Sequence, residues 1–465
     1  MWDSDGKALI SHRPRACPHA FMIEDEPKIK VGIIEQCRKI DGAFNGAYLL
    51  GHDLSLNGGF ALRVSGGEIV LYDAAGNAVL RQAELHCTPV DGSTFTLFDV
   101  VIGVHFHWER KQEQTFQGSL ILILDKHKNL VVINQISLED YLASVISSEM
   151  STGAPLEFLK AHAIISRSWL MAMLTRTRFT KNHGKVSFSP VLHTGEIVCW
   201  YDREDHTLFD VCADDHCQRY QGISRMMSGN ARHAVDITRG VFLTHNNEIC
   251  DARYHKACGG LTDNYESAWD DIQVPYLTSI ADSRSPHNPI GTESDAEHWI
   301  LSSPDAYCNT RDENVLTRIL PSVDLETTDF FRWKVAFTRK TLEGILQEKS
   351  GMNFGDLHNL VPIERGPSGR IVRLKIEGSK QTITIGKELE IRRWLSRTHL
   401  LSSAFVVTIE RDPSGIPIRF ILHGAGWGHG VGLCQIGAAV MAAKGCTAEE
   451  ILRHYFRNTE LRKLY

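Results

Sequence analysis

Two helical segments separated by a short break occupy positions 137–176 and constrain the fold most strongly. The first opens at Ser137 with an acid three residues later, Asp140, which is the spacing of a capping box. The second begins at Pro155, which a first helical turn tolerates because no amide hydrogen is needed there, and it runs toward Arg176. Apolar residues recur at helical spacing in the first segment, at Leu138, Leu142, Val145 and Ile146. We therefore expect two adjacent helices at the centre of the fold.

The break between these helices contains a carboxylate. Glu149 follows two serines and stands where the first helix ends. A carboxyl group held at such a place can serve as a general acid, although most acids at helix ends are simply solvated surface. Position alone leaves both interpretations open.

Strand patterns surround the helical centre on both sides. Ile29–Ile34 alternates as a strand does, and several short strand patterns separated by glycine turns follow it, ending in a hairpin that leads into Ser137. Helical spacing returns at Thr341–Gln347 and at Glu388–Leu395, with strand-like residues 363–385 between them. The sequence predicts the α+β class: a β-rich N-terminal part, a helical centre, and a mixed sheet with inserted loops.

No internal repeat, low-complexity tract or linker divides the chain. We expect residues 1–27 to form a tail or strap and residues 28–465 to form one elaborate domain. Within it, residues 28–136 would be the β-rich part, and residues 137–465 the core that carries the chemistry.

Charge and hydropathy narrow the choice of partners. The formal net charge of −6 argues against nucleic acid or an anionic membrane as the main partner. No stretch approaches the roughly 18 consecutive apolar residues of a membrane span. The first six residues lack the basic start and apolar run of a secretory signal, so this sequence shows no export signal.

A second motif, from Gly424 to Gly437, contains too many glycines for an ordinary helix or strand. It lacks the Lys-Ser/Thr of a phosphate loop. Its glycines project Trp427, His429 and Gln435, and an aromatic ring beside hydrogen-bonding side chains suits a sugar chain. The alternative is a tight turn around a buried histidine.

Together the two motifs resemble the SpoIID/LytB family of bacterial cell-wall proteins. The resemblance covers roughly Lys28 to Tyr465. The first motif appears as Tyr141-Leu142, Glu149-Met150-Ser151, Leu159-Lys160-Ala161-His162-Ala163 and Arg167-Ser168-Trp169, and the second as Gly424 to Gln435.

This resemblance implies a lytic transglycosylase that cleaves the MurNAc-GlcNAc β-1,4 bond of peptidoglycan, with Glu149 as its single acid and base. One carboxyl can suffice because the sugar's own 6-hydroxyl attacks and forms a 1,6-anhydro product, whereas ordinary glycosidases use two carboxylates. Trp427, His429 and Gln435 would line the same cleft, with Arg167 as a further candidate substrate contact. Ser151 stands where the family has a proline, which weakens the argument for a stiff turn after Glu149.

Two other functions stay open. The LytB side of the family resembles amidase enhancers, so the chain is alternatively a non-catalytic wall-binding protein that assists a cell-wall amidase. A purely structural protein of the cell envelope is the third hypothesis. The family implies work outside the cytoplasm, in the cell envelope.

Four potential metal ligands lie within twelve residues: His206, Cys212, His216 and Cys217. Two thiolates and two imidazoles complete a tetrahedral zinc set, and some family members bind zinc through a Cys/His group in this region. Such an ion would be structural, because protein atoms would fill all four positions. His255 and Cys258 could supply ligands instead. The remaining alternative is a cysteine-rich surface loop that binds no metal. The other cysteines, among eleven in total, are mostly isolated and indicate reduced core thiols.

Overall fold

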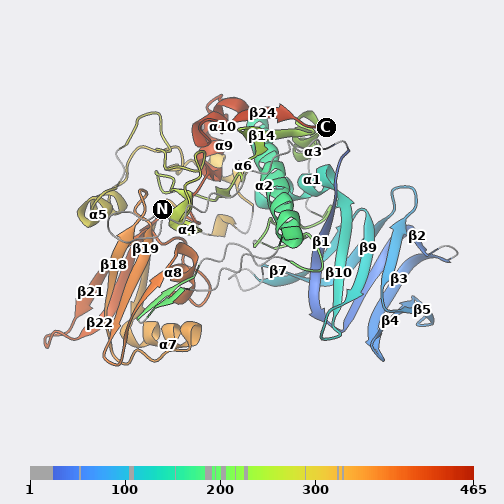
Figure 1. Ribbon diagram of the computed structural model, residues 1–465, viewed down its shortest axis with the longest axis horizontal. Coiled ribbons are helices and arrows are strands. Elements are labelled where there is room, and N and C mark those ends of the chain that lie inside the picture. Colours follow the sequence, from blue (N-terminus) through green and yellow to red (C-terminus); the bar gives the residue numbers. More distant parts are fainter. Residues whose placement is uncertain are drawn as a thin grey trace.

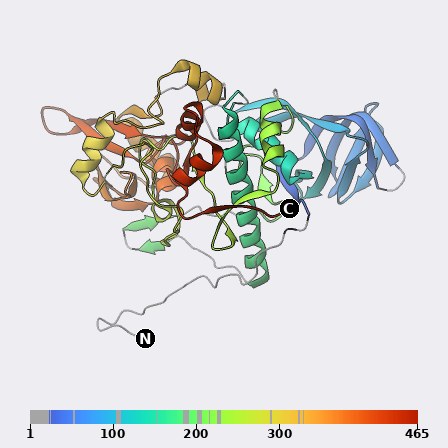
Figure 2. The ribbon, with the colours of Figure 1, turned by 90° about the horizontal axis from the view of Figure 1, so that it is seen from above.

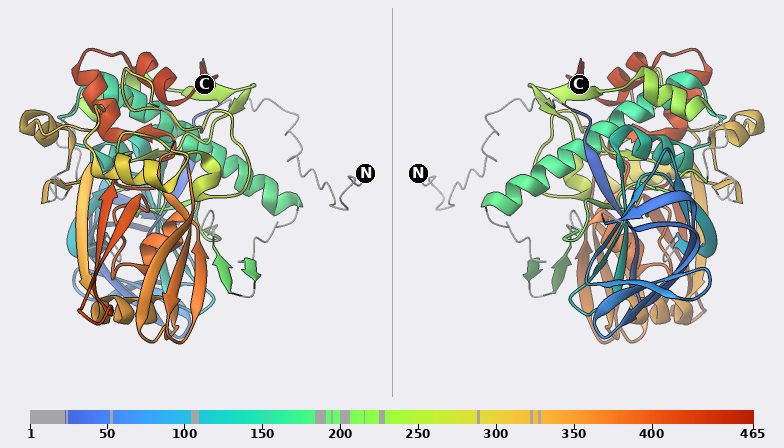
Figure 3. Two further views of the ribbon diagram at one scale, coloured as in Figure 1. Left: turned by 90° about the vertical axis from the view of Figure 1, so that its left-hand side faces the viewer. Right: turned by 90° about the vertical axis from the view of Figure 1, so that its right-hand side faces the viewer.

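Two β-rich lobes flank a helical centre in the computed structural model and reach to the same side of it (Figure 1). Figure 3 shows each lobe from its outer side. The structure describes residues 23, 25–51, 54–103, 109–151, 153–183, 191–193, 195–199, 206–214, 216–224, 229–287, 290–321, 324–326 and 329–465. Most of the predicted tail, residues 1–27, therefore lies outside the described residues.

The N-terminal lobe is a mixed sheet with the strand order β13-β1-β10-β9-β6-β2-β3-β4-β5, to which β7 and β8 add at β2. Its neighbours are antiparallel except β13, which runs parallel to β1. Aromatic rings stack in pairs within this sheet: the ring centroids of Phe44 and Tyr48 lie 4.5 Å apart, and those of Phe95 and Phe116 lie 5.2 Å apart. The strands are β1 Lys28–Cys37, β2 Lys39–Leu50, β3 Leu54–Ser65, β4 Glu68–Asp73, β5 Ala78–Gln82, β6 Leu85–Pro89, β7 Thr94–Ile102, β8 Arg110–Phe116, β9 Ser119–Leu124, β10 Leu130–Ser137 and β13 Val211–Cys212.

The helical centre begins where β10 ends. The Ser137 hydroxyl accepts a hydrogen bond from the Asp140 amide at 3.2 Å, so the predicted cap is confirmed. Helix α1, Leu138–Glu149, is buried along almost its whole length. Helix α2, Leu156–His183, extends seven residues beyond the predicted Arg176. Figure 2 shows α2 between the N-terminal lobe and helices α9, Gln435–Ala443, and α10, Ala448–Tyr455.

Smaller elements complete this centre. Strand β16, Tyr254–His255, pairs in parallel with β23, Leu433–Cys434, so two segments far apart in sequence meet here. The remaining elements are α3 Gly229–Ile237, β14 Val241–His245, β15 Glu248–Ile249, α4 Tyr265–Ala268, α5 Glu293–Leu301, α6 Glu313–Ile319, the 3₁₀ turn η1 Asp324–Glu326 and β24 Glu460–Lys463.

The C-terminal lobe has its own hydrophobic core, built around Trp333, Leu374, Trp394 and Phe420. One sheet has the order β17-β22-β21 and the other β11-β12-β20-β19-β18. Its elements are β11 Val191–His193, β12 Glu196–Val198, β17 Arg332–Thr338, α7 Arg339–Ser350, β18 Leu357–Arg365, β19 Ile371–Gly378, β20 Thr382–Gly386, α8 Glu388–Trp394, β21 Phe405–Arg411 and β22 Pro417–Ala425.

This architecture confirms the predicted α+β class with a β-rich N-terminal part. The prediction that the glycine run is neither strand nor helix is wrong for part of the run. Gly424 and Ala425 end β22, Leu433 and Cys434 form β23, and Gly437 lies in the first turn of α9. Whether the lobes behave as one domain stays a prediction. Among the described helices, none is both long enough and apolar enough to cross a lipid bilayer.

Candidate functional site

Glu149 is the last residue of α1. The next residue, Met150, is extended, and the Ser151 amide donates to the Ile319 carbonyl at 3.0 Å. That bond ties the turn to the end of α6, and a proline at position 151 could not make it because proline has no amide hydrogen. The departure from the family pattern therefore has a local role: the turn is fixed by a hydrogen bond in place of a proline ring.

The Glu149 carboxylate is held by one of its two oxygens. Oε1 accepts hydrogen bonds from the Arg219 amide at 3.0 Å and from the Tyr254 hydroxyl at 3.2 Å. The other oxygen, Oε2, has no hydrogen-bond partner among the residues that the structure describes. The side chain, which is only 8% exposed, is therefore oriented through Oε1.

Lys256 fixes the backbone beneath this carboxylate. Its ammonium group donates to the Glu149 carbonyl at 3.1 Å, which satisfies one of the free carbonyls at the end of α1. A cation at a helix C-terminus is also favoured by the helix dipole. Asp324 balances the buried charge, with an oxygen 2.7 Å from the lysine nitrogen.

Residues 218–221 cross α1 and deliver the Arg219 amide to Glu149. The Tyr220 ring stacks on Tyr141 at 5.2 Å, and its hydroxyl donates to the Asn134 side chain at 2.5 Å. The Gln221 amide donates to the Ser144 hydroxyl at 3.2 Å. This segment, residues 218–221, is thus attached to the helix at several points and begins directly after Cys217. It is called the strap from here on and is distinct from the N-terminal tail predicted for residues 1–27.

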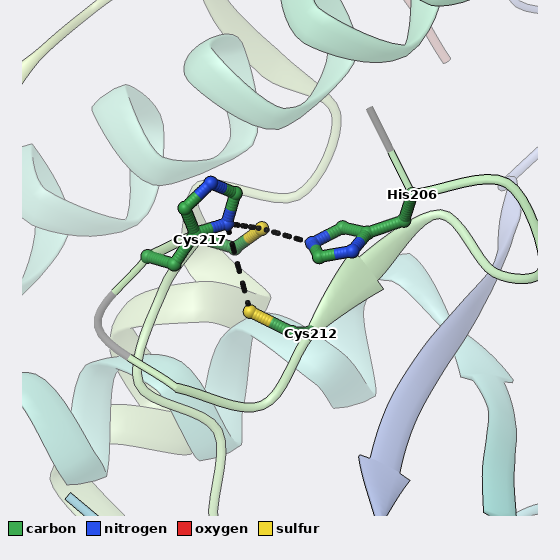
Figure 4. Close-up of side chains that lie close together, drawn as sticks. His206, Cys212 and Cys217 are labelled. Carbon is green, nitrogen blue, oxygen red and sulfur yellow. Dashed lines mark hydrogen bonds between the residues drawn. The ribbon is translucent and has the colours of Figure 1, made fainter. Parts of the chain in front are cut away.

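The four predicted metal ligands converge, as Figure 4 shows for the labelled His206, Cys212 and Cys217. Their ligand atoms, together with His216 Nδ1, lie within 4.8 Å of one another. Nε2 of His206 lies 3.3 Å from the sulfur of Cys217, and Nδ1 of His216 lies 3.8 Å from that of Cys212. A tetrahedral ion with Zn–S bonds of about 2.3 Å places its ligand atoms about 3.5–3.8 Å apart, so this set fits zinc.

The electrostatics of this cluster favour a metal as well. Hydrogen bonds from Cys217, His206 and His216 lower the pKa of Cys212 to about 2 despite its burial, whereas the same contact with Cys212 and burial raise the pKa of Cys217, so Cys212 is the ionised thiol of the pair. A thiolate is the form that binds metal. The alternative pair does not join this cluster: His255 Nδ1 donates to the Val431 carbonyl at 3.1 Å, and Cys258 belongs to a separate group of side chains.

The glycine run folds into a packed turn. His429 accepts a hydrogen bond from the Val431 amide at 3.1 Å, and its ring lies 4.7 Å from that of Trp269. Burial holds the pKa of His429 well below its usual value, so the ring is neutral. Gly430 has a φ of 82°, and a side chain there would meet the Arg370 guanidinium at 2.4 Å. The His429 side chain itself is half-buried, so the ring is packed on one side and keeps part of its surface exposed.

Two other predicted substrate contacts are engaged inside the protein. Gln435 is buried, and its amide nitrogen lies 2.9 Å from Nε2 of His162. Arg167 is 0% exposed and pairs with Glu139 through contacts of 2.6 and 3.0 Å. This corrects our expectation for Arg167: the side chain joins α1 to α2 and does not face a ligand. Trp427 is partly buried, and its backbone pairs with Ala257.

Sequence reasoning missed the residues that orient Glu149. Tyr254 and Lys256 come from β16 and its end, more than a hundred positions away, and Arg219 contributes only its backbone. The tyrosine and the lysine flank His255, for which the sequence predicted only a possible role as a zinc ligand. No local pattern marks them, because their role depends on the pairing of β16 with β23.

Two family models match separate parts of the chain. Residues 126–245, which include Glu149, the metal-ligand cluster and the strap, match the family model described as stage II sporulation protein. Residues 263–432 match a domain of unknown function, DUF8618.

Three relatives extend the likeness over most of the chain. An uncharacterized protein of Brachyspira hyodysenteriae is 26% identical over 74% of this chain and 72% of its own length. The stage II sporulation protein D of Bacillus subtilis is 25% identical over 71% of this chain and 75% of its own. The amidase enhancer of Bacillus subtilis is 24% identical over 69% of this chain but 40% of its own length. The chain is therefore similar over most of its length to stage II sporulation protein D, and residues 126–245 match the stage II sporulation protein family model.

Proposed function

We propose that this protein is a lytic transglycosylase that cleaves the MurNAc-GlcNAc β-1,4 bond of peptidoglycan glycan strands. The observation that carries the proposal is the state of Glu149: one oxygen is held by two donors and the other has no partner among the described residues. A general acid needs this combination of fixed orientation and a free oxygen.

In the proposed reaction, the protonated Glu149 Oε2 donates its proton to the glycosidic oxygen as the bond from that oxygen to C1 of MurNAc breaks. The carboxylate then accepts the proton of the MurNAc 6-hydroxyl as that oxygen bonds to C1. The product is a 1,6-anhydro sugar, and the carboxyl group is protonated again. Asp324 is already paired with Lys256, which fits a mechanism with a single carboxyl.

We also propose that one zinc ion binds His206, Cys212, His216 and Cys217 and has a structural role. The strap begins at Gln218, directly after Cys217, and its amides donate to Glu149 and Ser144 of α1. The ion would therefore anchor the segment that holds Glu149. Metal binding would then contribute both to folding and to placement of the acid.

The amidase enhancer among the relatives supports a second candidate. In that reading the protein binds glycan strands and assists a separate cell-wall amidase without cleaving them. The extracytoplasmic cell envelope would be the place of action for either function.

The test is digestion of purified glycan strands, with and without stem peptides, followed by mass spectrometry for 1,6-anhydro ends. Glu149→Gln keeps the shape of the side chain but cannot donate the proton, so we expect activity to fall about 10²–10⁴-fold with glycan binding retained. Glu449→Gln, an exposed acid on α10, is the matched control and should keep full activity. A wild-type protein that leaves strands intact but accelerates an added amidase would contradict the proposal and favour the enhancer.

A further inference from the structure

A second group of metal-ligating side chains lies in the core, away from the first cluster. Cys258, Asp282, Cys308 and Cys434 place their ligand atoms within 4.8 Å of one another. All four are at most 2% exposed. The sequence showed Cys308 and Cys434 as isolated residues and Cys258 only as an alternative ligand beside His255, because 176 positions separate Cys258 from Cys434.

The spacing of these atoms suits a single ion. The sulfurs of Cys258 and Cys308 lie 3.5 Å apart, close to the roughly 3.8 Å that tetrahedral Zn–S bonds impose. An iron–sulfur cluster would hold ligand atoms on different irons farther apart than the 4.8 Å within which all four ligand atoms lie here. Three sulfurs and one carboxylate oxygen complete a four-coordinate site.

Backbone amides are aimed at the sulfurs. Gly260 donates to the Cys258 sulfur at 3.3 Å, Cys258 donates to that of Cys434 at 3.3 Å, and Gly437 donates to the same atom at 3.4 Å. Such donors stabilise thiolates and orient them as ligands.

The carboxylate is oriented in the same way. Asp282 accepts hydrogen bonds from the Cys308 amide at 2.9 Å and from the Tyr455 hydroxyl at 2.5 Å. A side chain at Gly437 would meet an Asp282 oxygen at 2.3 Å, so the absence of one there permits the approach. An ionised aspartate buried among three thiols is costly unless a cation compensates its charge.

We propose that Cys258, Asp282, Cys308 and Cys434 bind a second zinc ion, independent of the one at Cys212. Cys258 and Cys434 stand just outside the two ends of the DUF8618 match, residues 263–432, which itself supplies Asp282 and Cys308. The ion therefore joins the entry and exit of that region to the helical centre. It also secures the pair β16 and β23, which carries Tyr254 to Glu149.

The test is metal content by mass spectrometry on protein purified without chelators. We expect about two zinc ions per chain in the wild type and about one in each of Cys308→Ser and Cys212→Ser. The double variant should contain none. Cys87→Ser, at a buried thiol of the N-terminal sheet, is the matched control and should keep both ions.

Cobalt substitution covers the case in which Cys308→Ser does not fold. In the Cys212→Ser background, one bound Co²⁺ should show sulfur-to-cobalt charge transfer and the visible bands of a tetrahedral ion, and Asp282→Asn should alter these bands. One zinc per chain in the wild type, with none in Cys212→Ser, would overturn the proposal. A Cys258–Cys308 disulfide found by peptide mapping under non-reducing conditions would also overturn it. Neither result depends on whether the protein cleaves glycan.

Discussion

The buried ion pair between Arg167 and Glu139 allows a quantitative test of the packing of α1 against α2. Arg167 donates to Glu139 through Nε and Nη2, at 3.0 and 2.6 Å, and to the Val241 carbonyl through Nη1, at 2.9 Å. Arg167→Met removes these bonds and leaves Glu139 buried. In that variant the Glu139 carboxylate still accepts hydrogen bonds from the Gly240 amide at 3.2 Å and from the Tyr465 hydroxyl.

Removing one partner of a buried pair costs about 3–5 kcal/mol. We expect the lower end, about 3 kcal/mol, because those two donors still satisfy part of the Glu139 charge. The double variant Arg167→Met/Glu139→Gln removes the charge that was left unpaired. Its loss of stability should therefore be about 2 kcal/mol smaller than the sum of the two single losses.

The assay is urea unfolding followed by far-UV circular dichroism, with the midpoint shift converted through a shared slope. Arg453→Met is the matched control: it breaks an exposed pair with Glu449, and it should cost less than about 0.5 kcal/mol. An Arg167→Met protein of wild-type stability that has lost glycan cleavage would refute the structural role. That result would restore Arg167 as a substrate contact.

Three further predictions follow from named contacts. Tyr254→Phe removes one of two hydrogen bonds to Glu149 and should slow glycan cleavage about three- to tenfold, whereas Tyr276→Phe, which removes a hydroxyl bonded to the Asp251 amide, should not. Cys212→Ser should remove one zinc, lower the melting temperature and slow cleavage by loosening the strap, whereas Cys37→Ser should change none of these; unchanged metal content would exclude this cluster as a zinc site. Burial lowers the pKa of His162 to about 3. The unfolded chain, with a histidine pKa of about 6.5, therefore binds one more proton than the folded protein between these values. Stability is full above about pH 6.5 and falls with acidification, by up to about 1.4 kcal/mol per pH unit for this residue. His162→Gln should reduce the slope of melting temperature against pH, and His127→Gln, at an exposed turn, should not; equal slopes in both variants would contradict the assignment.

Local chemistry made part of the structure predictable. The Ser137 cap, the helices on either side of the break and the strand that precedes them depend on neighbouring residues. Each is present at the predicted position, although α2 continues beyond its predicted end. The first metal-ligand cluster was visible because its members share one short loop.

Long-range contacts account for what was missed. His162 meets Gln435 across 273 positions, so neither a buried histidine nor an engaged glutamine could be read from a helical pattern. The second group of cysteines depends on the parallel pairing of β16 with β23, which no local signal announces. Arg167 has the spacing of a solvated helix charge, but its burial follows from Glu139 on the neighbouring helix.

The central claim is that Glu149 performs cleavage without consuming water, and digestion in water enriched in ¹⁸O tests it most directly. The carboxyl transfers a proton to the leaving oxygen, and the 6-hydroxyl of the sugar supplies the attacking oxygen. We therefore predict that the wild-type protein releases 1,6-anhydro products with no incorporated ¹⁸O, and that Glu149→Gln releases almost none. Products that carry one ¹⁸O at a new reducing end would show hydrolysis instead and would contradict the account.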